Sequence, residues 1–228
     1  MKTKFIVYAT ALLLSFPAML QAQTVVIRER VNTDTVVAQT KVNGGFFMDF
    51  TFYGGMDQKG LDGTFAQSIG FDFLPCVKYN FNKHTAAMLF LGFAVNQAGF
   101  KQSGENTTFP DTVTYNKSSF TQSSLALGLA LKRKLGSRVY VQLGAFAKWG
   151  FYNTYNYETT NKDGDKMDVM VRNPGYFNPF NYEACARVGI EGIHAVAYYR
   201  LSDMFSTTEH APVVYQTPRL RVGIGLGW

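Results

Sequence analysis

The residue types best suited to chemistry are spread along the chain. Ser206, Glu209 and His210 are the residue types of a hydrolytic triad and lie in one segment, whereas His84 and His194 fall near two different expected turns. The fold must bring a nucleophile and a base within hydrogen-bond reach, and a polar loop segment is the simpler interpretation of the first group. No spacing is typical of a metal site. We therefore expect neither an enzyme nor a cofactor.

A second set of candidate residues is charged and falls on one face of the expected strands. These side chains can line a path for ions or solutes, or they can pair with one another and fill a narrow lumen. Both signs occur in similar numbers, which favours pairing, with Asp72, Glu183, Lys78 and Arg187 as the expected partners. The full set is Asp49, Asp72, Lys78, Lys148, Glu183, Arg187, Arg200 and Arg221.

Cys76 and Cys185 are the two cysteines of the chain, and both are expected to face inward. An exported protein can form a disulfide. However, the two residues belong to the second and sixth expected strands, on opposite walls of a barrel, and a disulfide needs Cα atoms within about 7 Å. We therefore expect free thiols that fill space in the lumen.

Alternation with a period of two predicts the strands that position these side chains. In residues 125–131, leucine occupies every odd position and alanine or glycine every even one. Eight such segments are expected, at about 44–55, 67–81, 86–99, 118–132, 138–152, 181–191, 193–203 and 218–228. Most reach the roughly 9–11 residues that a tilted strand needs to cross a membrane.

The expected connections alternate between long and short. The long loops are 56–66, 100–117, 153–180 and 204–217, and the tight turns are 82–85, 133–137 and 191–193. Long external loops and short periplasmic turns are typical of outer-membrane barrels. An even number of strands returns the chain to its starting side, so both termini are expected in the periplasm.

The chemical character of the two strand faces separates a membrane barrel from a soluble one. A soluble β-sandwich or lipocalin-like barrel would keep its outward face polar, whereas here one face is large and apolar along whole strands and the other combines small and charged residues. Charged residues make up only 17% of the chain and aromatic residues 15%, against about 25% charged in soluble domains. The fold class expected is all-β, an eight-stranded antiparallel up-and-down transmembrane β-barrel.

The first residues have the pattern of a secretory signal peptide. Lys2 and Lys4 precede an apolar run over 5–16, and Ala22 is a small residue at the expected cleavage site. The expected organisation is a signal peptide at 1–22, a periplasmic tail at 23–43 and the barrel at 44–228. The net charge of +6 is mild and no run of five or six basic residues occurs, so nucleic-acid binding is not expected.

The chain resembles the PorT-like family of small outer-membrane β-barrels found in Bacteroidetes. The resemblance lies in the signal that ends Leu20-Gln21-Ala22-Gln23, in the segments 178–182 and 199–205, and in the terminal segment 220–228. It implies recognition of Trp228 by the barrel-assembly machinery, and outer-membrane lipid as the surrounding medium. Some members of the family, such as PorT and PorG, are accessory barrels of type IX secretion.

Three functions follow from this sequence. The first is an accessory or anchoring barrel that holds a periplasmic or lipoprotein partner of a secretion complex, with Val25, Ile27, Arg28 and Arg30 adding as a strand to the partner's sheet edge. In the alternative, the tail is a disordered linker and the barrel is a passive OmpA-like structural or adhesion protein that acts through its external loops. The third is a porin or an enzyme.

Overall fold

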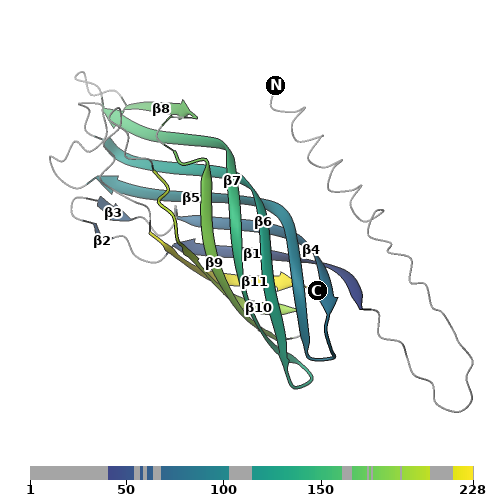
Figure 1. Cartoon of the computed structure of the whole chain (residues 1–228). Helices are drawn as coiled ribbons and strands as arrows, with labels where there is room; N and C mark the ends of the chain where they lie inside the picture. The colour runs from purple at the N-terminus through teal and green to yellow at the C-terminus, as the bar shows by residue number, and fades with distance from the viewer. Residues whose placement is uncertain are drawn as a thin grey trace, which may run out of the picture.

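The computed structural model contains strands, turns and loops and describes most of the chain. It describes residues 41–53, 57–58, 61–63, 68–102, 115–160, 166–173, 175, 177–190, 192–205 and 218–227. Over these ranges, no helix has the length and apolar character needed to cross a membrane. The strands wrap around a common axis (Figure 1).

Eight long strands close into an antiparallel barrel, which confirms the expected fold class. They are β1 (Val42–Tyr53), β4 (Ile69–Asn80), β5 (Thr85–Gln102), β6 (Tyr115–Leu135), β7 (Val139–Thr160), β9 (Phe180–Ile190), β10 (Ile193–Arg200) and β11 (Leu220–Gly227). Each pairs with the next, and β11 returns to pair with β1, with Asp49 opposite Gly225. Because the ring is closed, its backbone groups are satisfied within the sheet, as a hydrocarbon environment requires. β1 begins at Val42, so Val42 and Asn43 belong to the barrel rather than to the tail.

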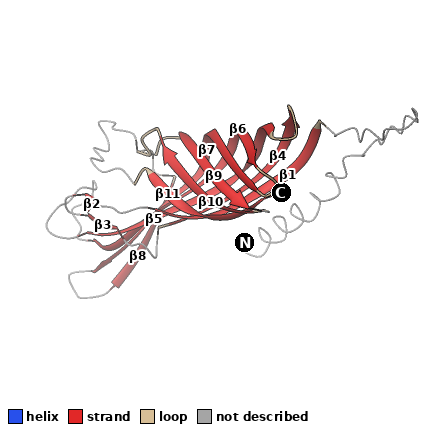
Figure 2. Ribbon diagram, turned by 90° about the horizontal axis from the view of Figure 1, so that it is seen from below, coloured by secondary structure: helices blue, strands red, loops and turns tan. Residues whose placement is uncertain are grey.

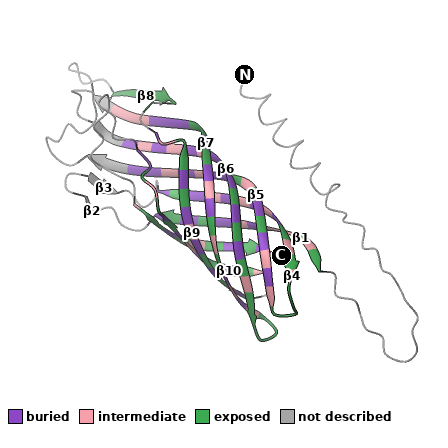
Figure 3. Cartoon of the chain, viewed as in Figure 1, coloured by how far each residue is buried: buried purple, intermediate pink, exposed green. Residues whose placement is uncertain are grey.

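The two faces of the strands differ as the alternation predicts. Leu127, Leu129 and Leu131 of β6 are 54%, 66% and 60% exposed, whereas Gly128 and Ala130 between them are buried. Figure 3 shows the same alternation of buried and exposed residues along the neighbouring strands. Exposed leucine on successive outward positions is unfavourable in water and favourable in lipid, so the outer surface is the membrane-facing surface.

One end of the barrel carries three tight connections and is called the short-turn end below. In the β4–β5 turn, Asn82 Oδ1 accepts hydrogen bonds from the backbone N–H groups of His84 and Thr85, at 2.9 and 2.8 Å. Gly136 and Gly192, in the other two turns, have positive φ angles of 86° and 94°, which glycine adopts at little cost. Tight turns occur near the three predicted places, although β6 continues to Leu135 and so occupies most of the predicted turn 133–137. Both the start of β1 and the end of β11 lie at this end.

The opposite end, called the long-loop end, contains more strand than expected. The segment 153–180 was predicted to be a loop, and this is wrong: β7 continues to Thr160 and pairs with β8 (Lys166–Arg172). β5 and β6 likewise extend into the predicted loop 100–117, and β2 (Asp57–Gln58) and β3 (Leu61–Gly63) add to β5. Figures 1 and 2 show β2, β3 and β8 together at this end.

The loop prediction is wrong because the change from apolar to polar residues marks where a strand leaves the membrane. It does not mark where the strand ends. β7 has 22 residues, about twice the number that crosses a bilayer, and its polar half pairs with β6 in water. A bulge at Phe151, between the pairs Ser123–Tyr152 and Ser124–Gly150, also shifts the alternation by one residue. As a result the inward positions change from even numbers such as Lys148 to odd numbers such as Tyr155.

Candidate functional site: the filled lumen

The inward faces of the strands meet in a lumen that contains most of the buried charged residues. Among the described residues, seven of the eight charged side chains predicted to face inward are buried: Asp49, Asp72, Lys148, Glu183, Arg187, Arg200 and Arg221. They come from β1, β4, β7, β9, β10 and β11. The lumen therefore holds the concentration of buried charged side chains that makes it the candidate functional site.

The first cluster is organised around the carboxylate of Asp49, which is fully buried. Arg187 donates from Nε and Nη2 to Asp49 Oδ2, at 3.1 and 2.7 Å. The hydroxyl of Tyr198 donates to the same oxygen, and Nε2 of His194 bonds the other carboxylate oxygen. The carboxylate thus has partners on both oxygens, which is the condition for burying a charge without a large penalty.

The second cluster is a crossed arrangement of two anions and two cations. Lys148 Nζ pairs with both Asp72 and Glu183, the latter at 2.8 Å. Arg221 pairs with the same two carboxylates, from Nη1 at 3.0 Å and from Nη2 at 2.8 Å. Arg221 Nη1 also donates to Asn96 Oδ1 at 2.6 Å. Each carboxylate therefore contacts both cations, so the charges balance within the cluster.

Tyr198 joins the two clusters. Its hydroxyl belongs to the Asp49 cluster, where Arg187 Nη2 donates to it. Its ring centroid lies 4.6 Å from the guanidinium carbon of Arg221 and 5.1 Å from Lys148 Nζ. Cation–π contacts of this kind are worth about 2 kcal/mol or more when they are desolvated. One aromatic side chain thus links the charges of both clusters into a single network.

Aromatic layers lie on both sides of the charged network. Toward the short-turn end, the ring of Phe90 lies 5.7 Å from that of Phe47 and 5.4 Å from that of Phe146. Toward the long-loop end, Phe120 stacks on Tyr155 at 4.5 Å and contacts Phe205 at 4.7 Å. All six rings are buried. Over the described residues, the lumen therefore has a charged centre between two apolar layers.

Two details of the predicted network need correction. Lys78 makes no ion pair with a described residue and lies at the mouth of the lumen, at the short-turn end. Arg187 was expected to pair with Asp72 and Glu183, but its carboxylate is that of Asp49. The side chains that meet depend on the height of each residue along the barrel axis, which the alternation does not specify. Arg200 is buried as expected, and its Nε donates to the carbonyl of Ser202 at 3.1 Å.

Cys76 and Cys185 are buried and are not joined by a disulfide, which confirms the expectation of free thiols. They lie on β4 and β9, which are separated by β5, β6 and β7 on one side of the ring and by β10, β11 and β1 on the other. Both belong to the apolar cluster that contains Phe47 and Phe90. Their role in the fold is to fill the narrow space beside these rings.

His194 and Tyr198 are network residues that the sequence reasoning missed. His194 was treated as a residue near a turn, but it is buried and bonded to Asp49. The alternation rule predicts both positions, because alternate residues of β10 share its inward face. These residues are His194, Val196, Tyr198 and Arg200. Asn96 and Thr51, which both accept from Arg221 Nη1, are found by the same rule in β5 and β1.

The histidine–carboxylate pair of His194 and Asp49 is fully buried in the lumen. His194 and Asp49 are enclosed by side chains, and the hydroxyl beside them, that of Tyr198, is itself bonded to Asp49 and Arg187. Among the described residues, no three or more of His, Cys, Asp and Glu come together as a metal site would require. Ser206, Glu209 and His210, the tail residues Val25, Ile27, Arg28 and Arg30, and Trp228 lie outside the described residues.

A closed eight-stranded barrel with a lipid-facing apolar surface and a polar interior is an outer-membrane β-barrel protein. A family model described as "outer membrane protein beta-barrel domain" matches residues 15–206. The chain therefore belongs to this family, and its place is the outer membrane. No curated protein and no solved structure matches the chain. The family match ends before β11, the strand that closes the ring.

Proposed function

We propose that this barrel is a non-enzymatic anchoring or accessory component, which holds a partner at the membrane and does not conduct solutes. The observation that supports this most is the filled lumen. Lys148, Arg221, Asp72 and Glu183 occupy its centre in mutual contact, and an eight-stranded barrel has room for side chains but not for a channel in addition. With the interior filled, binding has to take place at the two ends of the barrel.

The proposed orientation places the short-turn end in the periplasm. Short turns on that side and longer connections outside are the usual arrangement of such barrels. The start of β1 and the end of β11 both lie at the short-turn end, so a tail that follows a cleaved signal peptide at 1–22 would emerge there. A partner held by the tail residues 23–40 would then be periplasmic or a lipoprotein.

Type IX secretion is the system to which the proposed partner would belong. The support is the sequence resemblance to PorT-like barrels alone, in the segments 178–182, 199–205 and 220–228. In the proposed mode, Val25 and Ile27 fill alternate pockets while their main chain adds to a sheet edge of the partner. The barrel itself would supply a stable membrane anchor for this contact.

A passive structural or adhesion role is the second candidate, and a different observation favours it. At the long-loop end, β5, β6 and β7 continue past the membrane-spanning length and β8 extends the sheet further. Met167 and Met170 of β8 are about half exposed, and β8 has no second neighbouring strand among the described residues. An exposed strand edge of this kind is suited to contact with an external surface.

Affinity purification of the tagged protein from cross-linked membranes separates the two candidates. Deleting residues 23–40 leaves β1 intact, so the barrel should assemble but lose its periplasmic partner. The matched control replaces residues 161–173, including β8, by a short Gly-Ser linker, which should leave that partner bound. If the partner is lost only from the β8 variant, the external role is correct. If neither deletion changes the co-purifying proteins, the tail is a linker and the anchoring proposal fails.

A further inference from the structure

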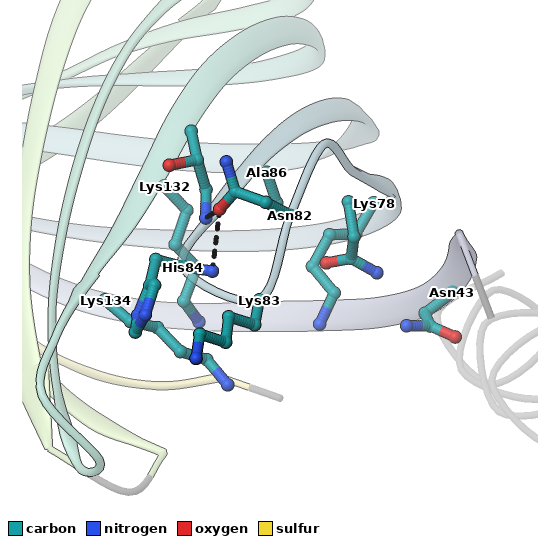
Figure 4. A pocket seen from close by; sticks show the side chains of 10 residues that line it. Asn43, Lys78, Asn82, Lys83, His84, Ala86, Lys132 and Lys134 are labelled. Atoms are coloured by element: carbon teal, nitrogen blue, oxygen red, sulfur yellow. Dashed lines mark hydrogen bonds between the residues drawn. The ribbon is translucent and has the colours of Figure 1, made fainter. Parts of the chain in front are cut away.

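We propose that the mouth of the lumen at the short-turn end is a binding site for phosphate groups. A cavity of about 200 Å³ opens there, between β4, the β4–β5 turn and β6. Four lysines and one histidine line it: Lys78, Lys83, Lys132, Lys134 and His84. Figure 4 shows these side chains gathered around one opening. They are called the basic mouth below.

Among the described residues, the basic mouth has no counter-charge of its own. None of the residues that line the cavity is acidic, and no described carboxylate forms an ion pair with any of its four lysines. Every other described acidic residue is remote: Asp49, Asp72 and Glu183 lie deeper in the lumen, and Asp57, Asp62, Glu158, Asp168 and Asp203 belong to the long-loop end. The contrast with the lumen centre, where carboxylates and cations balance, indicates that an external anion completes this site.

Lys132 is the clearest case of a cation at the mouth that has no described acidic partner. It faces into the mouth from β6 and is half-buried. Its Nζ lies 3.7 Å from the centroid of the Tyr140 ring and 5.7 Å from that of Phe47. Aromatic faces attract a cation but do not neutralise it. Lys132 therefore presents a positive charge at the floor of the cavity, close to Lys78 and Lys134 on its rim.

Neutral donors supplement the lysines. Asn82 Oδ1 accepts from the backbone N–H groups of His84 and Thr85, so the oxygen side of this amide is occupied within the turn. Its Nδ2 bonds no described residue and remains a donor. Asn43, which lines the same cavity from β1, has a side-chain amide without a described partner. The opening thus combines point charges with amide donors, the groups that phosphate oxygens accept from.

The residues that line the cavity favour binding of a phosphate group over binding of a carboxylate. Four ammonium groups converge on one small cavity, and a doubly charged phosphate relieves their mutual repulsion better than a single carboxylate does. Bidentate recognition of carboxylates favours the planar fork of arginine, and no arginine lines this cavity. The phosphate can belong to a soluble compound or to a lipid headgroup that ends in a phosphomonoester, since a phosphodiester carries only one negative charge. The inference concerns the mouth itself and does not depend on the proposed partner or orientation.

The test measures binding of pyrophosphate to the purified mature protein in a non-ionic detergent by titration calorimetry at low salt. Native mass spectrometry of the same protein with phosphatidic acid, whose headgroup is a phosphomonoester, tests the lipid source. The variant K78Q/K132Q removes two charges from the mouth. The matched control K166Q/R172Q removes two charges from β8, at the opposite end. The gel mobility of unheated samples shows whether each variant assembles into a barrel. If K78Q/K132Q does not assemble, the variant K83Q/K134Q replaces it in the binding test.

We expect pyrophosphate to bind the wild type and the control equally and to bind K78Q/K132Q at least tenfold more weakly. Retention of phosphatidic acid by the wild type, with loss in the mouth variant alone, identifies the lipid as the source, and binding of pyrophosphate without lipid retention identifies a soluble compound. The proposal is overturned if neither probe binds, if the control weakens binding as much as the mouth variant, or if an oligoglutamate peptide binds as tightly as pyrophosphate.

Discussion

Arg187 donates two hydrogen bonds to one carboxylate oxygen of Asp49, from Nε at 3.1 Å and from Nη2 at 2.7 Å, and both side chains are fully buried. The two residues lie on β1 and β9, 138 positions apart. A slip of one residue in either strand would turn one of them toward lipid, where a charge is costly. The pair therefore specifies the register of the barrel as well as filling its interior.

Replacing Arg187 by alanine should destabilise the barrel by about 3–5 kcal/mol, because it leaves the Asp49 carboxylate buried without its cation. The measurement is a urea titration of the protein in detergent micelles, with folding followed by gel mobility. Adding D49N to R187A should restore part of the lost stability, since the neutral amide no longer needs a cation.

The control for this variant is an exposed ion pair of similar chemistry. Arg219 and Asp203 pair at 2.8 Å, but their side chains are 44% and 53% exposed. R219A should change the free energy of unfolding by no more than about 1 kcal/mol. Equal destabilisation by R187A and R219A would show that burial of the pair is not what matters.

Gly223 should not tolerate a side chain. A Cβ at this position would collide with the carbonyl of Phe50 and with Cα of Thr51 on β1, and backbone atoms cannot move aside as a flexible side chain can. G223A should therefore reduce assembly of the barrel, measured as the folded fraction in purified outer membranes. G175A is the matched change, because a Cβ at Gly175 meets no atom of the described part of the chain within 4 Å, and it should assemble as the wild type does.

The barrel should be heat-modifiable on detergent gels. Its strands pair in a closed ring, so detergent alone finds no edge at which to begin opening it. Unheated and boiled samples should therefore migrate differently. The same mobility for both, together with recovery of the protein in the soluble fraction, would contradict the membrane barrel.

The lumen should not conduct ions at the level of a porin. The crossed pairs of Lys148 and Arg221 with Asp72 and Glu183, and the aromatic layers on either side, leave no room for a continuous water column. In planar bilayers we expect no steady channels. Large and reproducible conductance by the wild-type protein would reject the filled lumen as the resting state.

An epitope inserted into residues 161–165, between β7 and β8, should bind antibody on intact cells. The same epitope inserted at Lys83, in the β4–β5 turn, should bind antibody only after the outer membrane is opened, because the short turns are proposed to face the periplasm. Reversed labelling would show that the barrel is inserted in the other orientation. Labelling of neither insertion on intact cells would show that both ends are shielded.

Much of the architecture follows from the sequence because a membrane barrel obeys a local rule. Lipid and lumen impose opposite polarity on successive residues, so alternation alone identified eight strands, their approximate bounds and the inward position of Asp49, Asp72 and Arg187. The tight turns were equally local, since they depend on residues such as Gly136 and Asn82. The prediction of loops from polarity was wrong at the long-loop end, because the strands continue in water there. In that region, alternation no longer distinguishes a strand from a loop.

Only the tertiary structure decided which inward residues meet. Alternation gives the direction of a side chain but not its height along the axis, which depends on strand tilt and on the register of all eight pairings. Arg187 therefore reaches Asp49 rather than Asp72, His194 joins the network, and Lys78 stands at the mouth, close to Lys132. Each of these contacts joins residues on different strands, so no sequence window contains both partners.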